Sequence, residues 1–231
     1  MPKPRLKKAG KFLGIIAASI IGFVAGRTLS TIPISERGRI LKKETAAERK
    51  VERKIIKVPI KAKLNKKQII LLTEALCKKL KSEINPNFFK ALIQIESNYN
   101  PKAIGKHNDK GLLQLTPIAI KQIAKLGFRI TNPFDIEQNI IGGILLAKYN
   151  KSIAKFKTIK TRKGFKKVKR KYLYNGKLVE FDQLPKEIQL KILAEMHNKG
   201  PSFVKDSEKK EIEEKFTEYA KRFWEMYKVF K

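Results

Sequence analysis

The chain has 231 residues and carries 53 Lys and Arg against 21 Asp and Glu, a formal net charge of +32. Such an excess favours contact with anionic polymers or surfaces, but it does not choose between nucleic acid, lipid and cell-wall polymer. With 42% hydrophobic residues, the chain can bury the core of one domain of roughly 150–170 residues, which excludes global disorder. One cysteine, Cys77, and two histidines exclude an internal disulfide and a structural zinc site. We expect Cys77 to be a buried, unreactive side chain.

The N-terminus has the pattern of a membrane-insertion signal. A basic start precedes an uncharged run of fifteen residues, 12–26, which suits a signal peptide and is short for a spanning helix of about 20 residues. Lys11 and Arg27 could extend this run by reaching the two interfaces. No strong cleavage site follows, so we predict that residues 1–26 are an uncleaved membrane anchor of an exported chain, with a cleaved signal peptide as the alternative. Residues 27–66 are rich in charge and poor in aromatic residues, which predicts a basic linker.

Residues 67–231 are predicted to form one mainly helical domain. The apolar spacing predicts a first helix from about residue 66, and Asn85-Pro86 gives a cap and a first residue to a second helix that ends near Glu96. A polar, turn-rich segment follows. Pro117 begins a third helix that Gly127 can end, and Asp135 caps a long fourth helix.

Residues 153–184 interrupt the helices and are predicted to form an inserted basic β-hairpin, because Tyr-Asn-Gly stands between β-prone stretches. Pro185 then begins a helix that reaches His197. A last helix, from about Glu211, places its apolar residues on one side: Ile212, Phe216, Tyr219, Phe223 and Tyr227.

The basic hairpin has three interpretations. It is a solvated insertion, a surface that attracts anionic wall polymer or peptide carboxylates, or a nucleic-acid surface. The third rests on aromatic residues interleaved with Lys and Arg, as in stacking sites; these are Phe165, Tyr172, Tyr174 and Phe181. Export argues against nucleic acid as a partner unless the chain acts beside a DNA-transfer machine or in a phage particle.

Glu96 stands where the second helix should be apolar. Phe89, Leu92 and Ile93 share one face of this helix, and the next position on that face is Glu96. Apolar surroundings and the negative end of the helix dipole both disfavour an ionised carboxylate. A general acid that works near neutral pH needs this environment. The alternative is a glutamate at a frayed helix end that points into water.

Four stretches occur in order: ESNYNPKAIG from residue 96, GLLQLTP at 111–117, NPFDIEQNIIGG at 132–143 and HNKGP at 197–201. Together they resemble the motifs of the lysozyme-like lytic transglycosylases of the soluble Slt type, relatives of goose-type lysozyme. The usual motifs of that family are an ES pair, GLMQ, an aspartate-rich turn leading to Asn-Ile, and AYNAGP. The resemblance covers about residues 67–225, apart from the hairpin.

This resemblance implies a lysozyme-like helical fold that cleaves the β-1,4 bond between N-acetylmuramic acid and N-acetylglucosamine in peptidoglycan. Glu96 matches the single catalytic acid of the family, which acts without a cofactor or a metal. It would protonate the glycosidic oxygen and then act as the base that forms a 1,6-anhydro ring. Most glycosidases need a second carboxylate; here the N-acetyl group of the substrate is thought to take its place.

The resemblance also implies substrate-binding positions. Ser97 would form a hydrogen bond with the acid or the sugar, or else cap the end of the helix. Gly111 would let the sugar approach the backbone closely, or else be a turn glycine. Gln114 would line the glycan groove. Asn139 would hold the substrate or the Glu96 loop, and Asn198 and Gly200 match the second half of AYNAGP. His197 stands where the family has a tyrosine that bonds the catalytic acid, and Lys199 replaces an alanine.

Four interpretations of the function follow. The first is a monomeric murein transglycosylase of the cell envelope. It would be anchored in the inner membrane and face the periplasm, or it would be exported. A phage particle is another possible setting. A hydrolysing muramidase (lysozyme) and a non-catalytic glycan-binding envelope module are alternatives, and the His197 departure favours the module. A membrane-anchored, polyanion-binding protein ranks last because it leaves the four ordered motifs unexplained.

Overall fold

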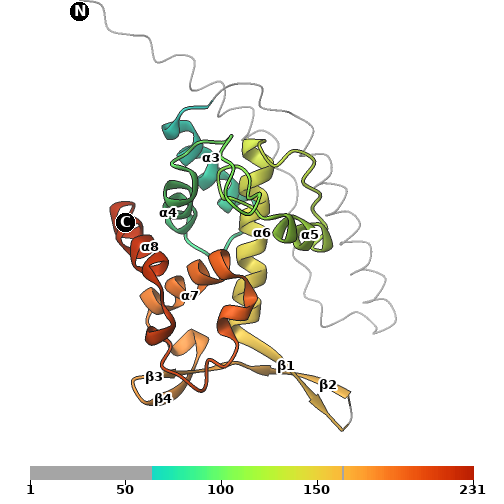
Figure 1. Cartoon of the computed structure of the whole chain (residues 1–231), viewed down its shortest axis with the longest axis vertical. Helices are drawn as coiled ribbons and strands as arrows, with labels where there is room; N and C mark the ends of the chain where they lie inside the picture. Colours follow the sequence, from blue (N-terminus) through green and yellow to red (C-terminus); the bar gives the residue numbers. More distant parts are fainter. Residues whose placement is uncertain (1–63, 163) are drawn as a thin grey trace, which may run out of the picture. The chain divides into compact units, whose positions relative to one another are not determined.

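The computed structural model describes residues 64–162 and 164–231, which contain six α-helices and two small antiparallel sheets (Figure 1). The expected anchor, residues 1–26, and nearly all of the expected linker lie outside these residues, so both stay predictions. No helix in the described part of the chain combines the length and the apolar composition that a membrane span requires. The mainly helical class predicted for the domain is confirmed.

The first two helices begin where the sequence predicts. Helix α3, Lys66–Lys79, starts with a capping box: the Asn65 side chain accepts from the Gln68 amide, and the Gln68 side chain accepts from the Asn65 amide. Helix α4, Pro86–Ser97, has Asn85 as its cap and proline as its first residue. These bonds satisfy amides that a helix start leaves without partners, and local sequence therefore sets both starts.

Helix α6 is the central element of the domain. It runs over Ile136–Lys155 behind its cap Asp135, and it packs against α3, α5 and α7 (Figure 1). Helix α5, Pro117–Lys125, is followed by Gly127 in the left-handed region (φ +95°), as predicted for its end. Cys77 of α3 is buried, as expected, and burial raises the pKa of its thiol to about 12.

Two consecutive hairpins replace the single hairpin predicted over residues 153–184. Strand β1 (Phe156–Thr161) pairs with β2 (Gly164–Lys169), and β3 (Lys171–Tyr174) pairs with β4 (Lys177–Glu180) around the turn Asn175-Gly176. Between them, the Arg170 guanidinium donates to the carbonyls of Ile153 and Val204, 3.0 Å away in both cases, and fastens the junction of the two hairpins to the domain. The predicted number of hairpins was therefore wrong, while the Asn-Gly turn is confirmed.

The second hairpin is fastened to the core. Tyr172 is completely buried, and its hydroxyl donates to the Ala154 carbonyl at 2.7 Å. Its ring lies 6.1 Å from that of Phe181, which is 1% exposed. These two rings, which the sequence placed among candidate stacking sites, are therefore core residues.

The last two helices bring the C-terminal part of the chain onto α4. Helix α7, Lys186–Lys199, packs against α8, Glu218–Val229, and α8 packs against α4. Helix α8 starts later than the predicted Glu211, because a 3-10 turn occupies Glu213–Lys215. The Phe223 ring of α8 lies 5.1 Å from the Phe88 ring of α4. This packing brings the first turn of α8 beside the end of α4.

Candidate active site

Glu96 lies in the last turn of α4, where the buried face of the helix reaches the surface. Phe89, Leu92 and Ile93 on that face are at most 1% exposed, whereas the Glu96 side chain keeps 18% of its surface exposed. The carboxylate is therefore set against the core and still open to solvent on one side. It does not extend freely into water, as the frayed-end alternative requires.

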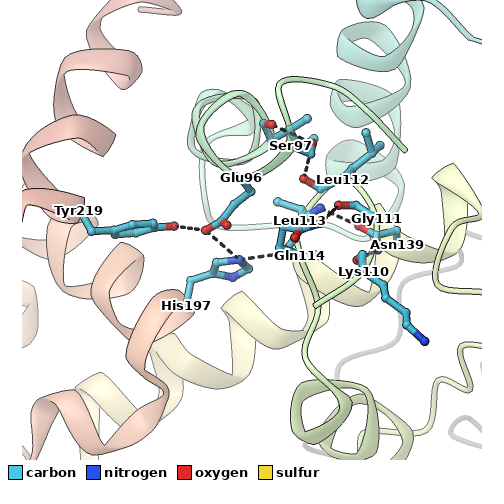
Figure 2. A network of polar contacts seen from close by, with 11 residues as sticks. Glu96, Ser97, Lys110, Gly111, Leu112, Leu113, Gln114, Asn139, His197 and Tyr219 are labelled. Atoms are coloured by element: carbon cyan, nitrogen blue, oxygen red, sulfur yellow. Dashed lines mark hydrogen bonds and ion pairs between the residues drawn. The ribbon is translucent and has the colours of Figure 1, made fainter. Parts of the chain in front are cut away.

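Tyr219 in the first turn of α8 holds this carboxylate. Its hydroxyl donates a hydrogen bond to Glu96 Oε1 (Figure 2). Burial in the first place, and then the charge and hydrogen bond of Glu96, raise the pKa of Tyr219 well above its usual value. The phenol thus stays protonated and acts as a permanent donor to one oxygen of Glu96, which leaves Oε2 for other partners.

His197 on α7 lies on a different side of Glu96 from Tyr219, but its hydrogen bond goes to another residue. Its Nε2 is 2.9 Å from the Leu113 carbonyl oxygen and 3.8 Å from Glu96 Oε1. Because a carbonyl only accepts, Nε2 carries the hydrogen of this bond. His197 thus ties α7 to residues 111–114, and Tyr219 makes the bond to the acid that the resemblance implied for the position of His197.

Asn139 of α6 holds the 110–113 segment from inside. Its side chain is fully buried; Oδ1 accepts from the Leu113 amide at 2.8 Å, and Nδ2 donates to the carbonyls of Lys110 and Pro133 at 2.9 and 2.8 Å. With no exposure, this amide cannot reach a substrate in the present structure. It holds the loop beside Glu96, which is one of the two roles expected of it.

Gly111 is required by this same contact. Its φ is +79°, and a Cβ at this position would lie 2.3 Å from Asn139 Nδ2 and 2.4 Å from the Pro133 carbonyl oxygen. Both distances are far inside van der Waals contact. Close packing of the loop on α6 therefore explains this glycine without a sugar.

Gln114 and Ser97 also make bonds within the loops. Gln114 Nε2 donates to the carbonyls of Gly111 at 2.7 Å and Ala103 at 3.1 Å. Ser97 Oγ donates to the Leu112 carbonyl at 2.8 Å, and the Ile93 carbonyl is a second acceptor at 3.1 Å. Figure 2 shows Ser97, Gly111 and Gln114 on the side of Glu96 that faces away from Tyr219. The contacts of Ser97 and Gln114 with substrate stay predictions, as does that of Asn198, which is exposed.

Glu195 lies under the start of α8 and is completely buried. Its Oε1 accepts from the amide and the hydroxyl of Thr217, at 2.7 and 2.5 Å, while Lys199 Nζ is 3.5 Å from Oε2. Thr217 is the residue before α8, so this carboxylate fixes the beginning of the helix that carries Tyr219. Its negative charge further raises the pKa of Tyr219.

Sequence reasoning missed both Tyr219 and Glu195 as site residues. The sequence pattern placed Tyr219 on an apolar helix face. The one signal for a polar contact is its hydroxyl, which the neighbouring Phe216 and Phe223 on that face lack. Glu195 has no motif to mark it. Among the described residues, no group of three His, Cys, Asp or Glu side chains is placed to hold a metal ion.

The comparison with protein families agrees with the resemblance that the motifs indicate. Residues 75–176 match the family model described as the transglycosylase SLT domain, a range that holds Glu96, Gln114 and Asn139 and ends before His197. The 70 kDa soluble lytic transglycosylase Slt70 of Escherichia coli is a similar solved structure, with 17% identity and a TM-score of 0.45 over 69% of this chain. The match covers 24% of the Slt70 chain, so this chain spans about a quarter of that protein. No curated protein matches the sequence.

Proposed function

Since the chain belongs to the lysozyme-like lytic transglycosylase family, we propose that it cleaves the β-1,4 bond between N-acetylmuramic acid and N-acetylglucosamine in peptidoglycan. Glu96 is the single general acid and base of this reaction. The observation that supports the proposal most directly is the largely buried carboxylate of Glu96, which stays open to solvent on one side and has one oxygen held by Tyr219.

The geometry divides the work between the two oxygens of Glu96. Because Tyr219 occupies Oε1, Oε2 carries the proton that passes to the glycosidic oxygen as the C–O bond breaks. The same carboxylate then accepts the proton of the muramoyl 6-hydroxyl, whose oxygen bonds to C1 and closes the 1,6-anhydro ring. Glu195, a second carboxylate in this network, is completely buried. As the resemblance to the family implies, the N-acetyl group of the substrate takes the part of the second carboxylate that most glycosidases need.

The products decide between the candidate reactions. We expect mass spectrometry of peptidoglycan digested by the protein to show 1,6-anhydro-muropeptides. Reducing ends in their place would make the chain a hydrolysing lysozyme. Retention of the protein on peptidoglycan with no soluble product would favour the non-catalytic glycan-binding module, and the same sample denatured by heat serves as the blank.

We place the domain outside the cytoplasm, held by residues 1–26, because a basic start precedes an uncharged run. Alkaline phosphatase is active only outside the cytoplasm. When it is fused after Lys231, it should therefore be active in intact cells. The matched fusion without residues 1–26 should be inactive. Equal activity of the two fusions would remove the insertion role of this segment.

A further inference from the structure

The β1–β2 hairpin is the most basic part of the described chain. Residues 155–171 contain ten Lys and Arg and no Asp or Glu, and the acid-free stretch runs from 138 to 179. The hairpin is a two-stranded ribbon that extends from the end of α6 (Figure 1). A structural ribbon does not need this charge, because cations at such density repel one another.

Only part of this charge is neutralised by contacts. Lys157 pairs with Glu208 and Lys169 pairs with Glu180, while Arg170 bonds two carbonyls within the domain. Within the β1–β2 hairpin itself, residues 156–169, four exposed cations make no ion pair with any described residue: Lys160, Arg162, Lys166 and Lys167.

The strand register divides the hairpin into two faces. Cross-strand partners point to the same face of a ribbon, so Lys160 shares a face with Phe165, and Thr158 shares it with Lys167. Phe165 is 79% exposed, and Lys167 Nζ lies 4.2 Å from the centre of the Phe156 ring on this face. We call Thr158, Lys160, Phe165 and Lys167 the basic face.

The geometry disfavours two kinds of polyanion. A nucleic-acid strand uses exposed aromatic platforms, but Tyr172 and Phe181 are buried, and Phe165 alone among the four candidate rings is largely exposed. A membrane surface takes up an apolar face, but the exposed Ile159 pairs with Lys166 and therefore lies on the opposite face from Phe165. Neither face is apolar enough to enter a bilayer.

We propose that the basic face is a second binding surface for peptidoglycan, which takes the carboxylates of its stem peptides and holds the enzyme on the wall between cleavage events. The inference rests on the proposed function, because it supposes that peptidoglycan is the substrate. Lys160 and Lys167 are diagonal neighbours on the paired strands, about 7–8 Å apart, so this face presents two adjacent cations to a polymer with repeated carboxylates. The exposed Phe165 ring offers a flat apolar surface to the sugars between them.

The test compares two variants of the full chain with the same change in charge. One replaces the two lysines of the basic face: Lys160→Gln and Lys167→Gln. The control replaces two exposed lysines of α5 that also make no ion pair with described residues: Lys121→Gln and Lys125→Gln. Both are made together with Glu96→Gln, so that the walls stay intact while binding is measured by co-sedimentation with sacculi free of secondary wall polymer.

We expect the hairpin variant to bind sacculi about tenfold more weakly than the control at roughly 0.01 M salt. The difference should disappear near 1 M salt, where the screening length falls to about 3 Å. It should also disappear on sacculi whose carboxylates have been converted to neutral amides. With Glu96 restored, both variants should cleave short peptide-free glycan chains at the parental rate. Absence of cleavage by the parent itself would count against the proposed function, whereas loss of cleavage in the hairpin variant alone would count against a separate binding surface.

Three results would overturn the proposal. The first is equal binding of the two variants to sacculi at low salt. The second is a difference that persists on sacculi whose carboxylates have been converted to neutral amides. The third is tighter binding of the hairpin to single-stranded DNA or to anionic phosphatidylglycerol vesicles than to sacculi, with the same loss in the hairpin variant.

Discussion

Glu96→Gln is expected to lower the rate of peptidoglycan cleavage by at least about 10²–10⁴-fold, the usual loss when a general acid is removed. The loss should lie at the upper end or beyond, because the same group serves as acid and then as base. The amide keeps the shape of the side chain, and its oxygen can still accept the hydrogen bond of Tyr219. The variant should therefore fold and bind glycan as the parent does, which thermal unfolding and co-sedimentation check.

Glu137→Gln is the matched control for this variant. The Glu137 side chain is 19% exposed and lies in the first turn of α6, with Lys79 Nζ at 4.0 Å. The Glu137→Gln variant loses a carboxylate of similar burial and leaves the hydrogen bonds around Glu96 unchanged. Its cleavage rate should therefore stay close to that of the parent. A Glu96→Gln variant that digests walls as fast as Glu137→Gln would show that Glu96 is a structural residue.

Tyr219→Phe is expected to give the second largest effect, a fall in kcat of roughly 10–100-fold. It removes a hydrogen bond to a carboxylate, worth about 1.5–3 kcal/mol, and each 1.4 kcal/mol is about tenfold in rate. KM should change little, because Tyr219 positions the acid and does not touch the sugar. Steady-state kinetics on soluble glycan chains separate the two constants.

Tyr227→Phe gives a control on the same helix. Tyr227 is buried and stacks on Trp224 with ring centres 5.3 Å apart, and its hydroxyl makes no hydrogen bond among the described residues. This variant should keep the parental kcat. A double variant tests the coupling: once Glu96 is Gln, Tyr219→Phe should cost little further activity. If Tyr219→Phe is as active as Tyr227→Phe, the hydrogen bond to Glu96 has no part in the reaction.

Local sequence determined most of the helices and the acid itself. The caps Asn65, Asn85 and Asp135 act within three residues of themselves, and the Asn175-Gly176 turn sets the pairing of β3 with β4. These features depend on short-range bonds, which a pattern of neighbouring residues expresses directly. The position of Glu96 on an apolar helix face was also visible from spacing alone.

The partners of Glu96 were decided only by the tertiary structure. Tyr219 is 123 positions away in the chain, and it reaches the acid because α8 packs on α4 while Glu195 fixes the start of α8. The division of residues 153–184 into two hairpins likewise depends on Arg170 and Tyr172 bonding distant backbone carbonyls. A side chain of Tyr, Arg or Glu can serve a helix face, a strand or a buried bond equally well. Its role is therefore set by the groups that folding brings within hydrogen-bond distance, and these have no fixed spacing in the sequence.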